Sequence, residues 1–306
     1  MASPSLPDRS TWNTGVAMSL EPLVRRVLAP NASPYTYTGT QTYLVGTGAD
    51  VAVIDPGPDG TGAPNHADTS AQGHVEAIMQ AVGSARVAAI VCTHTHRDHS
   101  PASRPLAALT GAPIIGCAPL ALDDSGPRAD AAFDPDYQPD RVLADGETLR
   151  GQGWTLEAVA TPGHTSNHLC LALHESGALF TGDHVMGWST SVVSPPDGDM
   201  AAYMASLQKL YERAQDRVYY PAHGDPIFNP HQFVRGMMGH RRQRERQILR
   251  LLETGQLAIP AMVEQMYKGL NPHLHGAAGR SVLAHLIDLE RQGRVVRWEE
   301  QWSIPS

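Results

Sequence analysis

The stretch Thr93-His94-Thr95-His96-Arg97-Asp98-His99 places three histidines and one aspartate within six residues. It directly follows residues 87–92, a short apolar run bounded by polar residues, which is typical of a buried strand. His94 and His96 lie two residues apart in an extended segment, so their rings can turn toward one point. Asp98 and His99 follow on the next turn and can address a second point nearby. Imidazole and carboxylate are ligands that Zn²⁺ and related first-row ions prefer, so this stretch predicts a metal site at the end of a strand.

Three further short motifs each place one metal-ligand side chain after a predicted strand. They are Pro162-Gly163-His164, Gly182-Asp183 and Ala222-His223-Gly224. A glycine beside each ligand permits a tight backbone turn close to a metal ion. Each motif alone would be a weak signal, because a single histidine after a strand is more often a surface or core residue. Together with the first stretch, the motifs add one ligand for a first ion, one bridging carboxylate and one ligand for a second ion.

The four motifs in this order, HxHxDH, PGH, GD and AHG, resemble the metallo-β-lactamase superfamily of metallohydrolases. The resemblance covers residues 44 to about 227 and is specific, since all seven ligand positions are filled. It implies an α+β fold, a four-layer αβ/βα sandwich in which two mixed sheets lie face to face with helices outside.

The resemblance also assigns a role to each ligand. The ligands that it implies for one zinc ion are His94, His96 and His164. Those that it implies for the other ion are Asp98, His99 and His223, with Asp183 bridging the two ions. Asp55, in Ile54-Asp55-Pro56-Gly57, matches the aspartate that orients a ligating histidine in the superfamily. We expect His168, which closely follows the PGH motif, to be structural or to contact a ligand.

The implied chemistry is hydrolysis. Two ions that share a water molecule lower its pKa toward neutrality, and the resulting bridging hydroxide attacks a carbonyl carbon or a phosphorus atom. The ions also offset charge that develops on the substrate oxygen. Asp98, besides binding metal, is placed to orient the nucleophile. The sequence therefore predicts a binuclear metal-dependent hydrolase, with a ligand set that suits iron and manganese as well as zinc.

The order of predicted elements changes near residue 235. Before it, strands are expected at residues 42–46, 51–55, 87–92, 113–116, 155–160, 169–173, 178–180 and 217–220. Helices are expected there at residues 74–82, 101–109 and 200–213. After it, helices at residues 247–253, 260–267 and 281–291 precede a hairpin formed by residues 295–298 and 301–304. We predict a catalytic domain of residues 1–234 and a helical, winged-helix-like domain of residues 235–306.

Composition indicates a cytoplasmic protein. No run approaches the roughly 20 apolar residues of a membrane span, and the first 19 residues do not read as a secretory signal. The three cysteines, Cys92, Cys117 and Cys170, are widely spaced among apolar residues, which favours free thiols in a reducing compartment. The net charge of −8 divides into −12 for residues 1–234 and +4 for residues 235–306, so the two parts are expected to make different contacts.

The C-terminal sequence bears on the substrate. The basic run His240-Arg241-Arg242-Gln243-Arg244-Glu245-Arg246, with the winged-helix-like region after it, resembles the β-lactamase-like protein 2 group. That group includes a zinc-dependent endoribonuclease, so the resemblance implies single-stranded RNA as substrate, with the arginines as phosphate contacts. A basic run on a helix also commonly faces solvent and pairs with nearby acids, and that reading stays open.

Other substrates and a role without nucleic acid stay open as well. A glyoxalase II-like thioesterase would use the same ligands on a thioester, and another small acyl or lactone substrate is a further alternative. β-Lactam hydrolysis is disfavoured, because Asp183 stands where one class of β-lactamase has a cysteine ligand. Residues 281–291, the predicted recognition helix, carry one arginine against Asp288 and Glu290, which favours packing or a homodimer over DNA reading. Loops at residues 58–70 and 189–199 are expected to shape the pocket.

Overall fold

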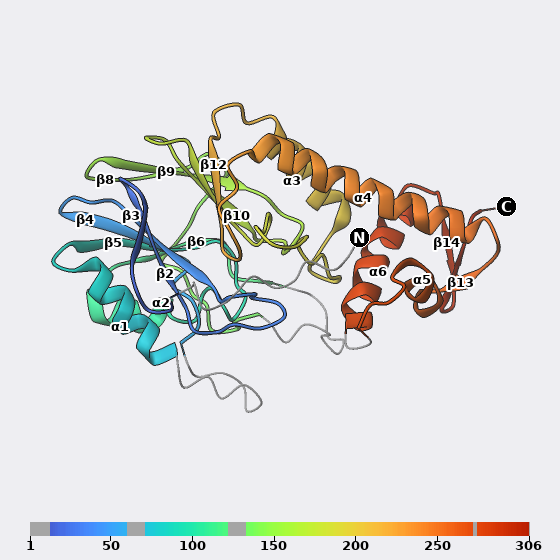
Figure 1. Cartoon of the computed structure of the whole chain (residues 1–306), viewed down its shortest axis with the longest axis horizontal. Coiled ribbons are helices and arrows are strands. Elements are labelled where there is room, and N and C mark those ends of the chain that lie inside the picture. The colour runs from blue at the N-terminus through green and yellow to red at the C-terminus, as the bar shows by residue number, and fades with distance from the viewer. Residues whose placement is uncertain (1–12, 60–70, 122–132, 272–273, 306) are drawn as a thin grey trace.

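Two mixed β-sheets form the centre of the protein in the computed structural model, which describes residues 13–59, 71–121, 133–271 and 274–305 (Figure 1). The strands of the first sheet lie side by side in chain order, namely β1 (Met18–Glu21), β2 (Val24–Leu28), β3 (Gln41–Val45), β4 (Asp50–Ile54), β5 (Arg86–Cys92), β6 (Ile114–Gly116) and β7 (Arg141–Val142). Neighbours from β1 to β4 are antiparallel, and neighbours from β4 to β7 are parallel. The second sheet has the order β12 (Val218–Pro221), β11 (Ala178–Gly182), β10 (Leu169–Leu173), β9 (Trp154–Ala160) and β8 (Thr148–Gly151). In it, β11 and β12 are parallel and the other neighbours are antiparallel.

The core lies between the two sheets and beneath the helices outside them. Side chains alternate between the faces of a strand, so in β3 Tyr43 and Val45 face the other sheet while Leu44 packs beneath helices. Tyr43 meets Phe180 of the second sheet, with ring centroids 5.0 Å apart. All residues of β3 and β4 are buried, as expected where both faces of a sheet are covered.

Two pairs of helices complete the layers. The first sheet is covered by α1 (Ala71–Val82) and α2 (Ser103–Thr110), and the second by α3 (Met200–Tyr211) and α4 (Pro230–Leu252) (Figure 1). The start of α3 is fixed by Asp199, whose side chain accepts a hydrogen bond of 2.9 Å from the backbone N–H of Ala202. The arrangement confirms the four-layer αβ/βα sandwich that the sequence predicts.

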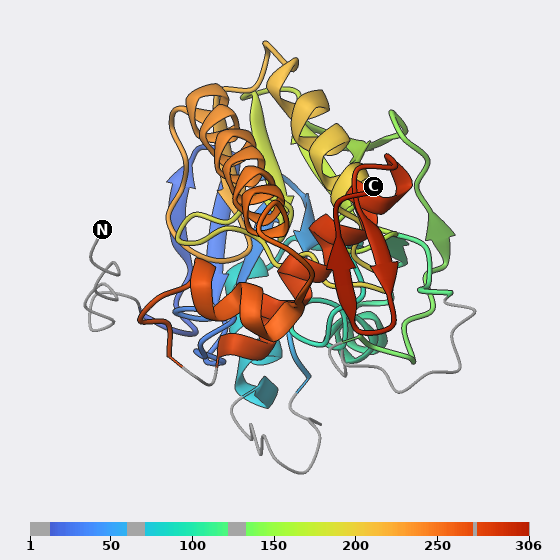
Figure 2. The same cartoon turned by 90° about the vertical axis from the view of Figure 1, so that its right-hand side faces the viewer.

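The C-terminal region forms a smaller unit at one end of the sandwich (Figures 1 and 2). It contains α5 (Ile259–Met266), α6 (His275–Arg291) and a three-stranded sheet in the order β13 (Leu257–Ala258), β15 (Gln301–Ser303) and β14 (Val296–Trp298). Ile248, Leu252, Leu286 and Trp302 belong to its apolar core. Helices followed by a two-stranded wing confirm the winged-helix-like prediction.

Helix α4 is longer than the sequence indicated. The prediction placed a helix at residues 247–253 only, whereas α4 starts at Pro230 and runs through both units. Proline suits the first helical turn, and Gly236 and Gly239 lower helix propensity without ending the helix. Val234 packs into the core beneath the second sheet, and Ile248 packs into the C-terminal core. The predicted domain division between residues 234 and 235 falls inside this helix, and it stays a prediction.

Five strands were not expected from the sequence, namely β1, β2, β7, β8 and β13. In β2, Arg25 and Arg26 interrupt the apolar pattern, yet four of its five residues are buried, and the buried Arg26 donates a 2.7 Å hydrogen bond to the side chain of Gln41. The three cysteines are buried free thiols, as expected. Among the described residues, no helix combines the length and the apolar character needed to cross a bilayer. Cytoplasmic location stays a prediction.

Candidate active site

The seven predicted metal ligands meet in loops that leave the carboxyl ends of four strands. Strand β5 leads into the loop of His94, His96, Asp98 and His99, and β9 leads into the loop of His164. Asp183 and His223 follow β11 and β12, which are parallel neighbours, so their carboxyl ends reach the same edge of the second sheet.

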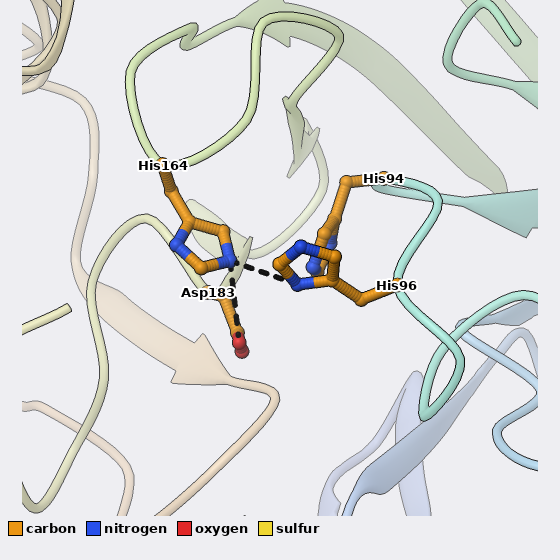
Figure 3. A group of neighbouring side chains, drawn as sticks. All are labelled: His94, His96, His164 and Asp183. Atoms are coloured by element: carbon orange, nitrogen blue, oxygen red, sulfur yellow. Dashed lines mark hydrogen bonds and ion pairs between the residues drawn. The ribbon is translucent and has the colours of Figure 1, made fainter. Parts of the chain in front are cut away.

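The first group of ligand atoms belongs to His94, His96, His164 and Asp183, and all four lie within 4.8 Å of one another (Figure 3). Nε2 of His164 lies 3.2 Å from Nδ1 of His96 and 3.6 Å from Oδ2 of Asp183. Three imidazoles and one carboxylate around a common point match the donor set of a zinc site.

The second group consists of Asp98, His99 and His223, whose ligand atoms also lie within 4.8 Å of one another. Oδ2 of Asp98 lies 3.3 Å from Nε2 of His99 and 3.1 Å from Nε2 of His223. Asp183 joins the two groups, because its Oδ1 lies 3.2 Å from Nε2 of His223 while its Oδ2 faces His164. The two oxygens of one carboxylate therefore face different groups, as a bridging ligand requires.

Several buried polar atoms at the centre make no hydrogen bond among the described residues. These atoms are Nε2 of His94, Nε2 of His99, Nε2 of His223 and Oδ1 of Asp183. Buried polar groups normally find a partner, so a cluster of atoms without one indicates an absent ligand. Nitrogen and carboxylate donors that converge in this way fit a pair of divalent metal ions. That these seven residues bind metal stays a prediction.

The electrostatics of the two carboxylates suit cations. Burial acts to raise the pKa of Asp98, but His99 and His223 beside it hold that pKa well below its usual range. Burial likewise opposes ionisation of Asp183, yet the same two histidines lower the pKa of its carboxyl group. Burial and the neighbouring imidazoles lower the pKa of His94 well below its usual value, so this ring is neutral and can offer a lone pair.

Oxygen atoms behind the histidines fix which ring nitrogen faces the centre. Nδ1 of His99 donates to the carboxylate of Asp55 over 3.0 Å, and Nδ1 of His164 donates to the carbonyl of Val192 over 2.6 Å. Nδ1 of His223 donates to the carbonyl of Gly39 over 3.2 Å. Such partners orient metal ligands, and the contact made by Asp55 is the one that the resemblance implied.

Asp55 itself is held by its neighbours. Its carboxylate accepts hydrogen bonds of 2.8 Å from the backbone N–H and from the hydroxyl of Thr93, and its backbone has φ 48°, which non-glycine residues rarely adopt. A strained backbone of this kind persists where the surrounding contacts hold the residue in place. The hydrogen bonds from Thr93 hold Asp55 in this way.

Some neighbours of the site were not identified from the sequence. The hydroxyl of Thr40 donates to Oδ2 of Asp98 over 3.4 Å, and neither spacing nor motif marks it. His168, which was expected to contact a ligand or be structural, accepts a 3.2 Å hydrogen bond from the backbone N–H of Asp183. Tyr37 and Trp188 stack with ring centroids 4.7 Å apart. Their chain neighbours Gly39 and Gly187 are hydrogen-bonded to His223, so this stack lies beside the second group.

The basic run of the C-terminal region divides between solvent and interior. Arg242 and Arg246 are exposed, as a phosphate-binding surface requires. Arg241 is buried, and the guanidinium of Arg244 lies 4.5 Å from the ring centroid of Tyr267. The predicted pocket loop at residues 58–70 lies mostly outside the described residues, whereas the loop at residues 189–199 supplies the partner of His164.

Each of the two units matches a known protein family. Residues 35–223 match the metallo-beta-lactamase superfamily, and residues 258–302 match the beta-lactamase associated winged helix domain. The atrochrysone carboxyl ACP thioesterase AgnL7 of Paecilomyces divaricatus is 34% identical over 257 residues, 82% of this chain and 68% of that protein. The beta-lactamase-like protein 2 homolog of Drosophila melanogaster is 32% identical over 286 residues, 89% of each chain.

Solved structures agree on the fold. The metallo-beta-lactamase family protein TTHA1429 of Thermus thermophilus superposes with a TM-score of 0.75 at 23% identity, covering 94% of this chain and all of that chain. These matches confirm the resemblance seen in the sequence, the winged-helix region and the prediction of a hydrolase. The identity and number of the metal ions stay predictions.

Proposed function

Because the chain belongs to the metallo-beta-lactamase superfamily, we propose that it is a binuclear metal-dependent hydrolase that cleaves acyl thioesters. The observation that carries the binuclear part is the position of Asp183, whose two carboxylate oxygens face the two groups of predicted ligands. When bound there, a pair of divalent ions would supply Lewis-acid activation of water and of the scissile carbonyl. Zinc is the ion that we assign to both groups.

The residues of the chain have distinct tasks in this proposal. Asp98 orients the attacking water, and its low pKa keeps the carboxylate ionised for that purpose. The hydroxyl of Thr40 and the ring of His223 fix the position of Oδ2 of Asp98 from two sides. The stack of Tyr37 and Trp188 provides an apolar wall near His223, against which an acyl group can lie.

Thioesters are favoured over RNA by three observations. Two relatives, 34% and 32% identical to this chain over the aligned residues, are named atrochrysone carboxyl ACP thioesterases. The negative balance of residues 1–234, 12 basic against 24 acidic side chains, repels a polyanion from the catalytic unit. Of the four arginines that the RNA hypothesis needs, Arg241 is buried and Arg244 is half-buried against Tyr267.

Cleavage of single-stranded RNA is the second candidate. The observation in its favour is the Drosophila relative named beta-lactamase-like protein 2 homolog, which matches 89% of both chains. Arg242 and Arg246 lie four residues apart on α4 and are exposed. One face of the helix therefore presents two arginines that can contact phosphates.

A direct comparison of substrates tests the proposal. Zinc-loaded protein is mixed with acetyl and benzoyl thioesters of N-acetylcysteamine, and thiol release is followed with a colorimetric reagent. The same preparation is mixed with an end-labelled single-stranded RNA. We expect thiol release that falls by about a thousandfold in Asp98→Ala, a loss of the size expected for a group essential to activation of the nucleophile. RNA cuts that vanish in the variant, without thiol release, would replace the thioester proposal with the second candidate. If the protein catalyses neither reaction, both candidate functions are contradicted.

A further inference from the structure

The segment of residues 191–199 is hydrogen-bonded to the loop that carries His164. The carbonyl of Val192 accepts the 2.6 Å hydrogen bond from Nδ1 of His164. Farther along, Oδ1 of Asp197 accepts from the backbone N–H of Ser166 over 3.0 Å, and the N–H of Asp199 donates to the carbonyl of Gly163 over 2.9 Å. The place of this segment therefore decides how the His164 ring is turned.

Arg241 of α4 holds the start of this segment. Its side chain is buried, and one terminal nitrogen donates a hydrogen bond to the carbonyl of Ser191, the residue before Val192. The other terminal nitrogen lies 3.4 Å from the hydroxyl of Ser281 on α6, and the guanidinium lies 5.1 Å from the ring centroid of Tyr203. A planar guanidinium with partners on three sides has one favourable orientation.

A second connection leads from the same arginine toward Asp183. The hydroxyl of Ser191 donates to the carbonyl of His184 over 2.8 Å, and the hydroxyl of Tyr203 donates to the same carbonyl over 3.0 Å. His184 directly follows Asp183 in the chain. Two of the three residues that Arg241 contacts, Ser191 and Tyr203, thus bond to the backbone next to the bridging carboxylate.

The charge around Arg241 makes these contacts difficult to replace. Among the described residues no carboxylate forms an ion pair with it, and Arg241 acts instead, after burial, to lower the pKa of the nearby rings of His240 and His285. A buried cation then depends on carbonyl oxygens and an aromatic face for its stabilisation. Removing the guanidinium leaves the carbonyl of Ser191 without this donor, which frees residues 191–192 to move.

We infer that Arg241 is a positioning residue that links the C-terminal unit to the metal centre, because it fixes residues 191–192 and through them the His164 ring. This inference rests on the proposed function only for the identity of His164 as a metal ligand. Helix α4 then does more than pack against its neighbours. Arg241, which lies between the residues of α4 that enter the two apolar cores, contacts the segment that orients His164.

The variant that tests this is Arg241→Met, which keeps an unbranched side chain as far as the position of Nε and removes the guanidinium donors. Hydrogen exchange of the metal-free protein, read by mass spectrometry, should show at least tenfold faster exchange in peptides covering residues 188–194. Zinc affinity, measured by competition with a chelating dye, should fall about tenfold at one site only, in line with the usual effect of removing a group behind a ligand. His164→Ala identifies which of the two affinities belongs to that site.

Matched controls come from exposed arginines. Arg242→Gln changes the neighbouring, exposed residue of the same helix, and Arg291→Gln removes an ion pair to Asp199 whose arginine side chain is 60% exposed. Both should leave exchange and zinc affinity within twofold of the native protein, since exposed ion pairs contribute little. Arg241→Lys keeps the buried charge without the planar fork, and it serves as the second variant if Arg241→Met does not fold.

The outcomes separate this inference from the proposed function. Native exchange in residues 188–194 and native zinc affinity, in a variant that melts at the native temperature, would overturn the role of Arg241. Absence of thioester hydrolysis by the native protein would contradict the proposed function and leave these results intact, since neither readout involves a substrate. If zinc does not bind, the exchange measurement alone decides.

Discussion

The carboxylate of Asp55 lies 3.0 Å from Nδ1 of His99, and neither side chain is more than 2% exposed. Asp55 thereby turns Nε2 of His99 toward Asp98 and Asp183. Asp55→Asn keeps the shape of the side chain and removes its charge, so we expect zinc affinity and turnover to fall about 10- to 100-fold. Zinc titration of the metal-free variant measures the first effect, and unchanged affinity would show that Asp55 only supports the fold.

Metal binding should stabilise the protein strongly, since it gives ligand bonds to buried atoms that make no hydrogen bond among the described residues. Thermal unfolding with excess zinc and with excess chelator should differ by about 4 kcal/mol per ion when zinc stands at a thousand times its Kd. Asp183→Asn should remove most of this difference, because its carboxylate faces both groups. The exposed Glu253→Gln is the control and should keep the full difference.

Close approach of two backbones at Gly163 leaves no room for a side chain. A Cβ there would lie 2.3 Å from the backbone nitrogen of Tyr203, and the residue has φ +136°. Gly163→Ala should therefore destabilise the protein by about 3 kcal/mol or more, as clashes with backbone do. At Gly83, also with positive φ but with open space around it, alanine should cost about 1 to 2 kcal/mol. Equal losses in urea unfolding would contradict this account.

Acid should weaken the contact between α4 and α6 through His285. Burial, followed by the charges of Arg241, His240 and Arg244, lowers the pKa of His285 to about 3. The unfolded chain, with a pKa near 6.5, binds the proton first, so the stability of the neutral ring is complete above pH 6.5 and declines as the pH falls toward 3. Between pH 8 and pH 5 the loss from this residue is about 2 kcal/mol.

His285→Leu removes this titration, and the measurement is the difference in unfolding free energy between the variant and the native protein at the two pH values. The native protein should lose about 2 kcal/mol more than the variant on going from pH 8 to pH 5. Parallel losses in both proteins would show that His285 is not held neutral.

The sequence predicted the site better than its surroundings. HxHxDH and the three later motifs identify side chains that the structure brings within 4.8 Å in two groups, because metal ligands must be of few chemical types at fixed strand ends. The backbone carbonyls of Gly39 and Val192 that orient His223 and His164 could not be predicted, since every residue has a carbonyl.

Elements with apolar periodicity were also predicted well, whereas short strands with charged residues were not. β10 was placed at its observed bounds, and β2 was missed because Arg25 and Arg26 occupy its middle. The basic run at residues 241–246 shows a further limit of pattern reading. Four arginines in six residues look alike in sequence, but helical geometry turns Arg241 inward and Arg242 outward. Only tertiary packing distinguishes a solvated charge from a buried one.

Helix α4 also fixes how the C-terminal unit is rotated relative to the catalytic unit. Its 23 residues form an uninterrupted rod, with Met237 and Met238 in the catalytic core and Ile248 and Leu252 in the C-terminal core. One residue inserted between Met238 and Arg241 would turn everything after it by about 100° and advance it by about 1.5 Å. The winged-helix unit would then face another direction, with Arg241 pointing away from residue 191. The number of residues along this one helix is therefore a dimension of the active site.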